Sequence, residues 1–205
     1  KKLANIKMDK FATNQVTDMS LMFSDCNALT SLNLNNFETS KVENMQGMFQ
    51  NCQSLTELDL SKFNTIKVKA MNAMFLNCQK LTSLNIANFN TKETKYMSYM
   101  FSECNSLSSL DVSSFDTKNV ALGIKMFQGC KNLKKLDIMN FSTSSFQSMV
   151  SMFENCVSLT SLDLSKFDTR QVTSMDSMFN GCTSIVSINL ENFVTNNVIY
   201  MNKMF

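Results

Sequence analysis

Apolar and polar residues alternate along this chain in a pattern that returns every 26 residues. A Met-Phe pair keeps that spacing from Met22 and Phe23 to Met204 and Phe205, without an insertion or a deletion. The cysteines keep it too: Cys26, Cys52, Cys78, Cys104, Cys130, Cys156 and Cys182. A repeat of fixed length indicates a solenoid, in which successive units stack and share one core.

Each unit has two halves with different periods. Leu58 and Leu60 alternate with polar residues, which predicts a short strand that is buried on one face. Between Val42 and Cys52 the apolar residues recur three or four positions apart, which predicts a short amphipathic helix. Thr39 stands just before that predicted helix, as a Thr does in every unit, so we expect its hydroxyl to cap the helix.

All units run in the same direction, so their strands must be parallel to one another. The connections between parallel strands of one sheet are strongly biased to right-handed crossovers. The L-x-x-L-x-L spacing of Leu55, Leu58 and Leu60, with a period in the twenties, resembles the leucine-rich-repeat signature. The sequence therefore predicts an α/β fold, a right-handed leucine-rich-repeat solenoid of about eight 26-residue repeats. We expect its parallel β-sheet on the concave side and its short helices on the convex side. Both ends of the sequence fall inside a repeat, so we expect residues 1–205 to form a single repeat array, a fragment of a longer chain.

The composition argues against several functions. The chain has no His, which removes His-based catalysis and His-ligated metal, and no cofactor motif is present. The net charge is only +2 and no run of Lys or Arg occurs, which disfavours nucleic acid as a partner. No run of 18 apolar residues exists, so we expect no direct membrane insertion by this segment.

The cysteine column has three interpretations. The simplest is a row of buried, small apolar side chains, because Cys is among the most buried residue types. Disulfides between stacked units would need closer Cβ atoms than parallel neighbours provide. Zinc sites pair cysteines a few residues apart, and no such pair occurs here.

One outward column of the predicted strands carries acids and amides. Its members Asp111, Asp137 and Asp163 would stack about 5 Å apart, as a ladder for a cation or another ligand. Alternatively, these side chains bond into neighbouring turns or are simply solvated. Met139 is the one large apolar residue on this otherwise polar face.

The opposite side has one irregular zone. Gly123 stands where other units carry Met, so we expect Leu122 or Ile124 to turn inward and replace the missing side chain. Tyr96 and Tyr99 are predicted to point outward nearby. These two form the second candidate partner-binding group, as a small apolar contact patch.

The unit LTSLDLSKFDTRQVTSMDSMFNGC, from Leu159 to Cys182, resembles the BspA-like leucine-rich-repeat surface proteins. The same 26-residue unit is a domain of unknown function common in mycoplasmas and other bacteria, and occurs in protists. The resemblance implies a non-catalytic protein at the cell surface or outside the cell. It also implies adhesion or binding of an unidentified protein or glycan.

An intracellular assembly scaffold or structural spacer is the alternative, with self-association or a larger assembly as its consequence. The buried Cys and Met residues and the polar strand face are compatible with it.

Overall fold

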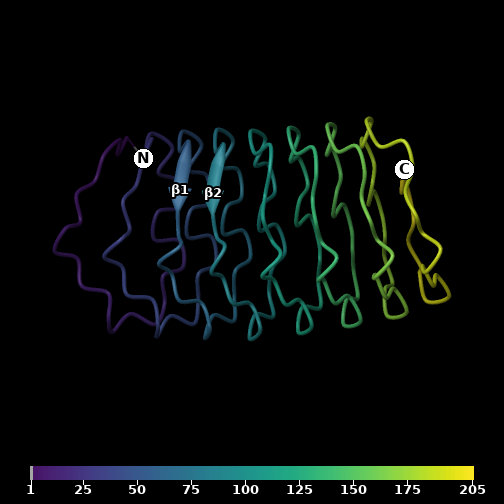
Figure 1. The fold of residues 1–205 in the computed structure, drawn as a ribbon, viewed down its shortest axis with the longest axis horizontal. Coiled ribbons are helices and arrows are strands. Elements are labelled where there is room, and N and C mark those ends of the chain that lie inside the picture. The colour runs from purple at the N-terminus through teal and green to yellow at the C-terminus, as the bar shows by residue number, and fades with distance from the viewer. Residues whose placement is uncertain (1) are drawn as a thin grey trace.

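The computed structural model describes residues 2–205 as a stack of similar coils wound along one axis (Figure 1). Two strands are regular, β1 (Glu57–Asp59) and β2 (Ser83–Asn85). They pair in parallel, with Leu58 opposite Leu84. Paired residues are 26 apart in the sequence, so each coil lies directly against the next, as a solenoid requires.

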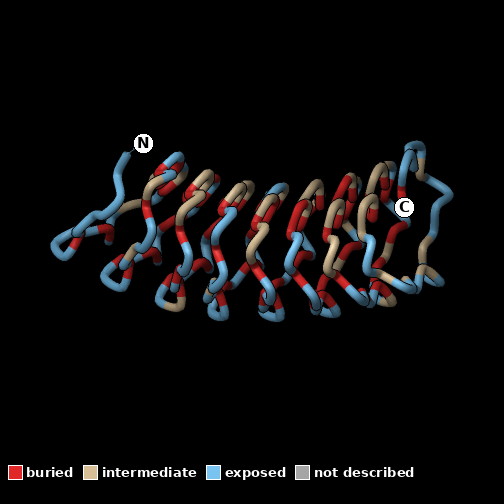
Figure 2. Tube along the Cα trace, turned by 90° about the horizontal axis from the view of Figure 1, so that it is seen from above, coloured by how far each residue is buried: buried red, intermediate tan, exposed pale blue. Residues whose placement is uncertain are grey.

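The strand pattern agrees with the predicted faces. Leu58 is buried between the exposed Glu57 and Asp59, and Leu60 is buried as well. Along the tube in Figure 2, buried residues alternate with exposed ones through the middle coils, whereas residues 182–203 are exposed or half-buried. The corresponding segments of the other coils repeat the burial pattern but do not form regular strands in residues 2–205.

The predicted helices are wrong, because the structure has no helix within residues 2–205. Between Met45 and Cys52 the N–H of every second residue donates three residues back, for example Cys52 to the carbonyl of Phe49 at 3.1 Å. The intervening amides donate to the next coil, and the N–H of Phe49 lies 2.9 Å from the carbonyl of Met74. The segment is therefore a row of turns that is hydrogen-bonded to the same segment of the next coil.

The spacing of the coils explains why a helix fails here. An α-helix with side chains is about 10–12 Å wide, whereas paired strands lie about 4.8 Å apart. The rings of Phe49 and Phe75, in the same position of successive coils, have centroids 5.7 Å apart and are nearly parallel. A helix in each coil would force these rings much farther apart.

Two left-handed residues in each coil prevent the turns from continuing as a helix. Gly47 has φ of 59° and Asn51 has φ of 61°. Gly and Asn adopt this region with the least strain. The same two positions in the next coils hold Ala73 and Asn77, then Tyr99 and Glu103, all with positive φ. Apolar residues three and four apart still face inward, so the helical period appears without the helix.

The threonine column also has a different role from the predicted cap. The Thr39 hydroxyl donates to the carbonyl of Asn64 at 3.1 Å and accepts the N–H of Asn64 at 2.7 Å. Thr65 and Thr91 bridge to the following coil in the same way. These Thr side chains are buried, and each hydroxyl is satisfied by the backbone N–H and carbonyl of one residue in the next coil.

The space beside Gly123 is filled by a residue other than the two expected from the sequence. Leu122 is exposed and Ile124 is only half-buried, so neither turns inward as expected. Phe146 of the next coil fills the space instead: a Cβ added to Gly123 would lie 2.7 Å from its ring. Phe146 is fully buried and stands where most coils have Val. The loss of one large side chain is compensated by the gain of another.

This pairing predicts a strong coupling between two substitutions. Phe146→Val leaves a cavity, and Gly123→Met forces a clash with the Phe146 ring, so each should lower the free energy of unfolding by about 2–4 kcal/mol. The double variant restores the arrangement of the regular coils and should recover most of that loss. Urea unfolding of the four proteins measures the coupling. Additive losses would show that the two sites do not share one space.

Candidate binding surfaces

The cysteine column lies inside the stack, and none of the seven cysteines forms a disulfide. Each from Cys52 onward donates its S–H to the carbonyl of a Phe in the preceding coil. Cys104 bonds to Phe75 at 3.2 Å in this way, and Cys130 bonds to Phe101 at 3.2 Å. The interpretation as small buried side chains is confirmed for six of them, while Cys182 is only partly buried. The hydrogen bond was not anticipated.

Burial raises the pKa of the Cys130 thiol to about 12 and raises that of Cys104 well above its ordinary range. The thiolate is the reactive form of cysteine, so these side chains are chemically inert in the folded chain. Their arrangement serves packing and hydrogen bonding between coils.

We expect the Cys182 thiol to react first with a disulfide reagent such as DTNB. The other six should react only as fast as the chain unfolds, because burial hides them and disfavours their thiolates. The Cys182→Ser variant is the matched control, and its reaction with the reagent should lack the rapid phase. Rapid reaction of the interior thiols Cys78 or Cys104 in native protein would contradict this packing.

Each acid in the outward column of the strand face accepts a hydrogen bond from the backbone just after it. The carboxylates of Asp111 and Asp163 accept the N–H of the residue two positions on, Ser113 and Ser165, at 2.9 Å each. Asp137 accepts the N–H of Met139 at 3.1 Å. All three carboxylates are exposed, and no group of three or more potential metal ligands is found in residues 2–205. Each acid therefore has a local structural role as an Asx turn.

These bonds lower the pKa of Asp111 and Asp163, chiefly through the hydroxyls of Ser113 and Ser165 and then through the backbone N–H groups. Backbone and side-chain bonds from Ser61 do the same for Asp59. A carboxyl with a depressed folded pKa adds stability above its unfolded pKa, and that stability is lost as pH falls through the folded value.

The triple variant Asp59→Asn, Asp111→Asn, Asp163→Asn should therefore lose less stability than the parent between about pH 6 and about pH 3. Asn forms the same turn, as Asn85 does with Ala87, so the variant should remain folded at neutral pH. Chemical unfolding midpoints at the two pH values give the comparison. An equal acid-induced loss in both proteins would show that these turns do not depend on ionisation.

A hollow of about 440 Å³ lies over the strand face at β1 and β2. Leu32, Leu34 and Leu58 form its apolar part, and Glu57, Asp59, Asn33 and Asn85 are among its polar lining residues. It lies at earlier coils than the column residues proposed from the sequence. Met139, with 37% of its surface exposed, belongs to the same face farther along the stack.

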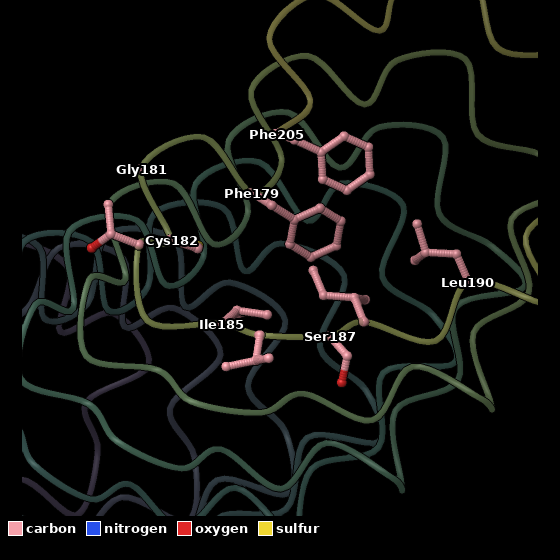
Figure 3. Close-up of a pocket in the computed structure, with 10 residues that line it drawn as sticks. Phe179, Gly181, Cys182, Ile185, Ser187, Leu190 and Phe205 are labelled. Carbon is pink, nitrogen blue, oxygen red and sulfur yellow. The ribbon is translucent and has the colours of Figure 1, made fainter.

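A second hollow opens at the last described coil (Figure 3). The rings of Phe179 and Phe205 stack at its edge with centroids 5.9 Å apart, and Ile185 and Leu190 point toward it. These residues repeat the core columns of earlier coils, where the next coil covers them. The hollow is lined mostly by apolar residues, and no carboxylate, Lys or Arg lines it.

Tyr96 and Tyr99 belong to residues 92–99, the segment that leads into the row of turns of their coil. This segment is separate from the strand segment of the same coil. Tyr96 is 57% exposed and Tyr99 is 38% exposed. Lys125 of the next coil places its ammonium 5.8 Å from the centre of the Tyr99 ring. No hydrogen bond or ion pair joins these tyrosines to Asp111, Asp137 or Asp163 in the described part of the chain. The two candidate groups stand at different positions of the 26-residue unit.

Comparison with known proteins identifies the repeat. The family model described as "Mycoplasma protein of unknown function, DUF285" matches residues 1–109, 56–161 and 97–205. The chain belongs to this family. The resemblance inferred from the 26-residue unit is thereby confirmed, and a search of curated protein sequences gives no match.

Solved structures with a similar fold are bacterial leucine-rich-repeat proteins. The T. pallidum leucine-rich-repeat protein is 18% identical with a TM-score of 0.53, and the match covers 83% of this chain and 72% of that one. A leucine-rich-repeat protein of Eubacterium ventriosum is 21% identical with a TM-score of 0.52, over 87% of this chain and 43% of its own. At these identities the likeness shows the leucine-rich-repeat solenoid fold alone.

Within residues 2–205 no helical stretch has the length and hydropathy that crossing a bilayer requires.

Proposed function

We propose that this family member is a non-catalytic binding module that is displayed at the cell surface and acts in adhesion. One observation carries the proposal: most core positions keep one residue type or a similar apolar type from coil to coil, while outward positions on the same backbone change in charge and size. The position of Tyr96 shows this variation, because other coils place Asp18, Asn44, Ala70, Leu122, Ser148, Ser174 and Tyr200 there. A constant frame with a varied surface suits recognition of a large partner.

The surface chemistry supports binding over catalysis. Within residues 2–205, no Ser or Cys side chain that lines a described hollow donates a hydrogen bond to a carboxylate of that hollow, and no group of three potential metal ligands is found. The interior thiols are protonated and buried. The exposed carboxylates of the strand face are engaged in Asx turns. A rigid stack with mixed polar and aromatic surfaces fits partner recognition.

The thiol column favours a second candidate, an intracellular assembly scaffold. Seven cysteines without a disulfide are easiest to maintain in a reducing compartment, although burial also protects six of them.

Protease treatment of intact source cells separates the two. If the protein is displayed, an antibody against this chain should lose its signal while a cytosolic marker remains. Survival of the signal until the cells are lysed, with a known surface protein cleaved in the same sample, would sink the adhesion proposal and favour the scaffold.

A further inference from the structure

One edge of the stack collects lysines that are far apart in the sequence. The edge runs through the segment after each buried Thr, and in three successive coils these segments are residues 66–73, 92–99 and 118–125. We call these three segments the lysine edge. They hold six lysines and one acid, Glu93: Lys67, Lys69, Lys92, Lys95, Lys118 and Lys125. The corresponding segments 14–21, 40–47, 144–151, 170–177 and 196–203 together hold three cations and three acids.

Backbone contacts place the three segments side by side. The N–H of Lys95 donates to the carbonyl of Lys69 at 2.9 Å, and Asn119 donates its side-chain amide to the carbonyl of Lys92 at 2.8 Å. Lys69 and Lys95 occupy the same position of neighbouring coils, so their backbones lie about one strand spacing apart along the stack.

The row of charge is only partly neutralised. Glu43 of the preceding coil forms an ion pair with Lys69, with the two atoms 2.7 Å apart. The hydrogen bond and charge of Lys69 hold the pKa of the Glu43 carboxyl below its usual range, and the charge of Lys67 makes a smaller contribution. The ammonium groups of Lys67, Lys92, Lys95 and Lys118 are exposed and form no ion pair with any of residues 2–205. Like charges in register repel one another, so this edge is poised to accept an anion.

Apolar side chains stand among the lysines. The exposed ring of Tyr96 lies on the middle segment, and Leu122 is exposed at the same position of the next coil. Lys125 covers one face of the Tyr99 ring. The edge thus combines a flat aromatic surface with flexible point charges on both sides along the stack.

We propose that the lysine edge binds an acidic polysaccharide that lies along the stack axis. Its sulfate or carboxylate groups would contact lysines of successive coils, and one sugar ring would rest its C–H face on Tyr96. The proposal names the ligand class for one surface of the binding module and rests on the proposed function in that sense.

The chemistry favours a polysaccharide over a nucleic acid. The planar fork of Arg is well suited to bidentate contacts with base edges and phosphates, and this chain has one Arg, Arg170, which is outside the lysine edge and bound to Asp168. Binding to single strands stacks successive bases on several open rings. Here Tyr96 stands alone, because the cation of Lys125 lies over the Tyr99 ring.

The neutral segment 144–151 supplies a design for the test. The variant Lys92→Ser, Lys95→Gln, Lys118→Ser takes the residues Ser144, Gln147 and Ser144 that stand at the matching positions. A heparin-derived octasaccharide is the probe, and its affinity for the purified chain is measured by calorimetry at several salt concentrations. We expect the variant to bind about tenfold more weakly or worse, with a shallower dependence on salt.

The matched control removes the same charge elsewhere, by Lys131→Ser, Lys134→Ser, Lys135→Ser, in another exposed part of the chain. It should keep the parent affinity within about twofold, a difference smaller than about 0.5 kcal/mol. Tyr96→Ser should weaken binding without changing the salt dependence, and Tyr96→Phe should restore it. All variants change exposed side chains, and their unfolding midpoints check that the fold is kept.

Equal affinity of the parent and the lysine-edge variant would overturn the proposal. So would binding of polyglutamate, a DNA oligonucleotide or phosphatidylserine vesicles as tightly as the octasaccharide, because each would assign the edge to another partner. Since the measurement uses purified protein, its failure leaves the protease result on cells unaffected, and the two proposals fail separately.

Discussion

Hydrogen bonds between neighbouring coils set the geometry on which the rest of this structure depends. Every second amide in the rows of turns donates to a carbonyl one coil away, as Ala73 does to Ser98 and Phe75 does to Met100, each at 2.9 Å. These bonds hold the coils close together, and the stacked Phe rings follow that spacing with centroids 5.5 Å apart at Phe75 and Phe101. A buried N–H without a partner costs about 1–3 kcal/mol, so no coil can leave the register cheaply.

The same register determines what the side chains do. Because each residue lies beside its counterpart 26 positions away, equivalent side chains form continuous columns along the stack. The Thr column bridges backbones, the Cys column bonds to carbonyls of the preceding coil, and the Phe columns stack. The register also explains the lysine edge, which has no contiguous run of charge in the sequence and forms only when Lys69 and Lys95 are brought together.

The solenoid, its parallel stacking and its inward residues were predictable, because they depend on period and burial alone. Leu58, Met74, Phe75 and Cys78 are buried as expected. The pattern could not show that residues 2–205 form turns instead of helices, since residues three and four apart face one way both in a helix and in these turns. The signal that distinguishes the two lies in the left-handed positions, where Gly47, Asn51, Asn77 and Gly129 are common types for positive φ. Phe146 could also have been found, because it replaces a Val in the unit that follows Gly123.

The hydrogen-bond partner of the Phe75 amide distinguishes bonding between coils from an α-helix within one coil. In a chain labelled with ¹⁵N and ¹³C, a scalar coupling across the hydrogen bond identifies the carbonyl that accepts each amide. The account predicts a coupling between the amide nitrogen of Phe75 and the carbonyl carbon of Met100, in the next coil. A coupling from the same nitrogen to the carbonyl of Met71, four residues back, would show an α-helix. That result would contradict a row of turns that is hydrogen-bonded to the next coil.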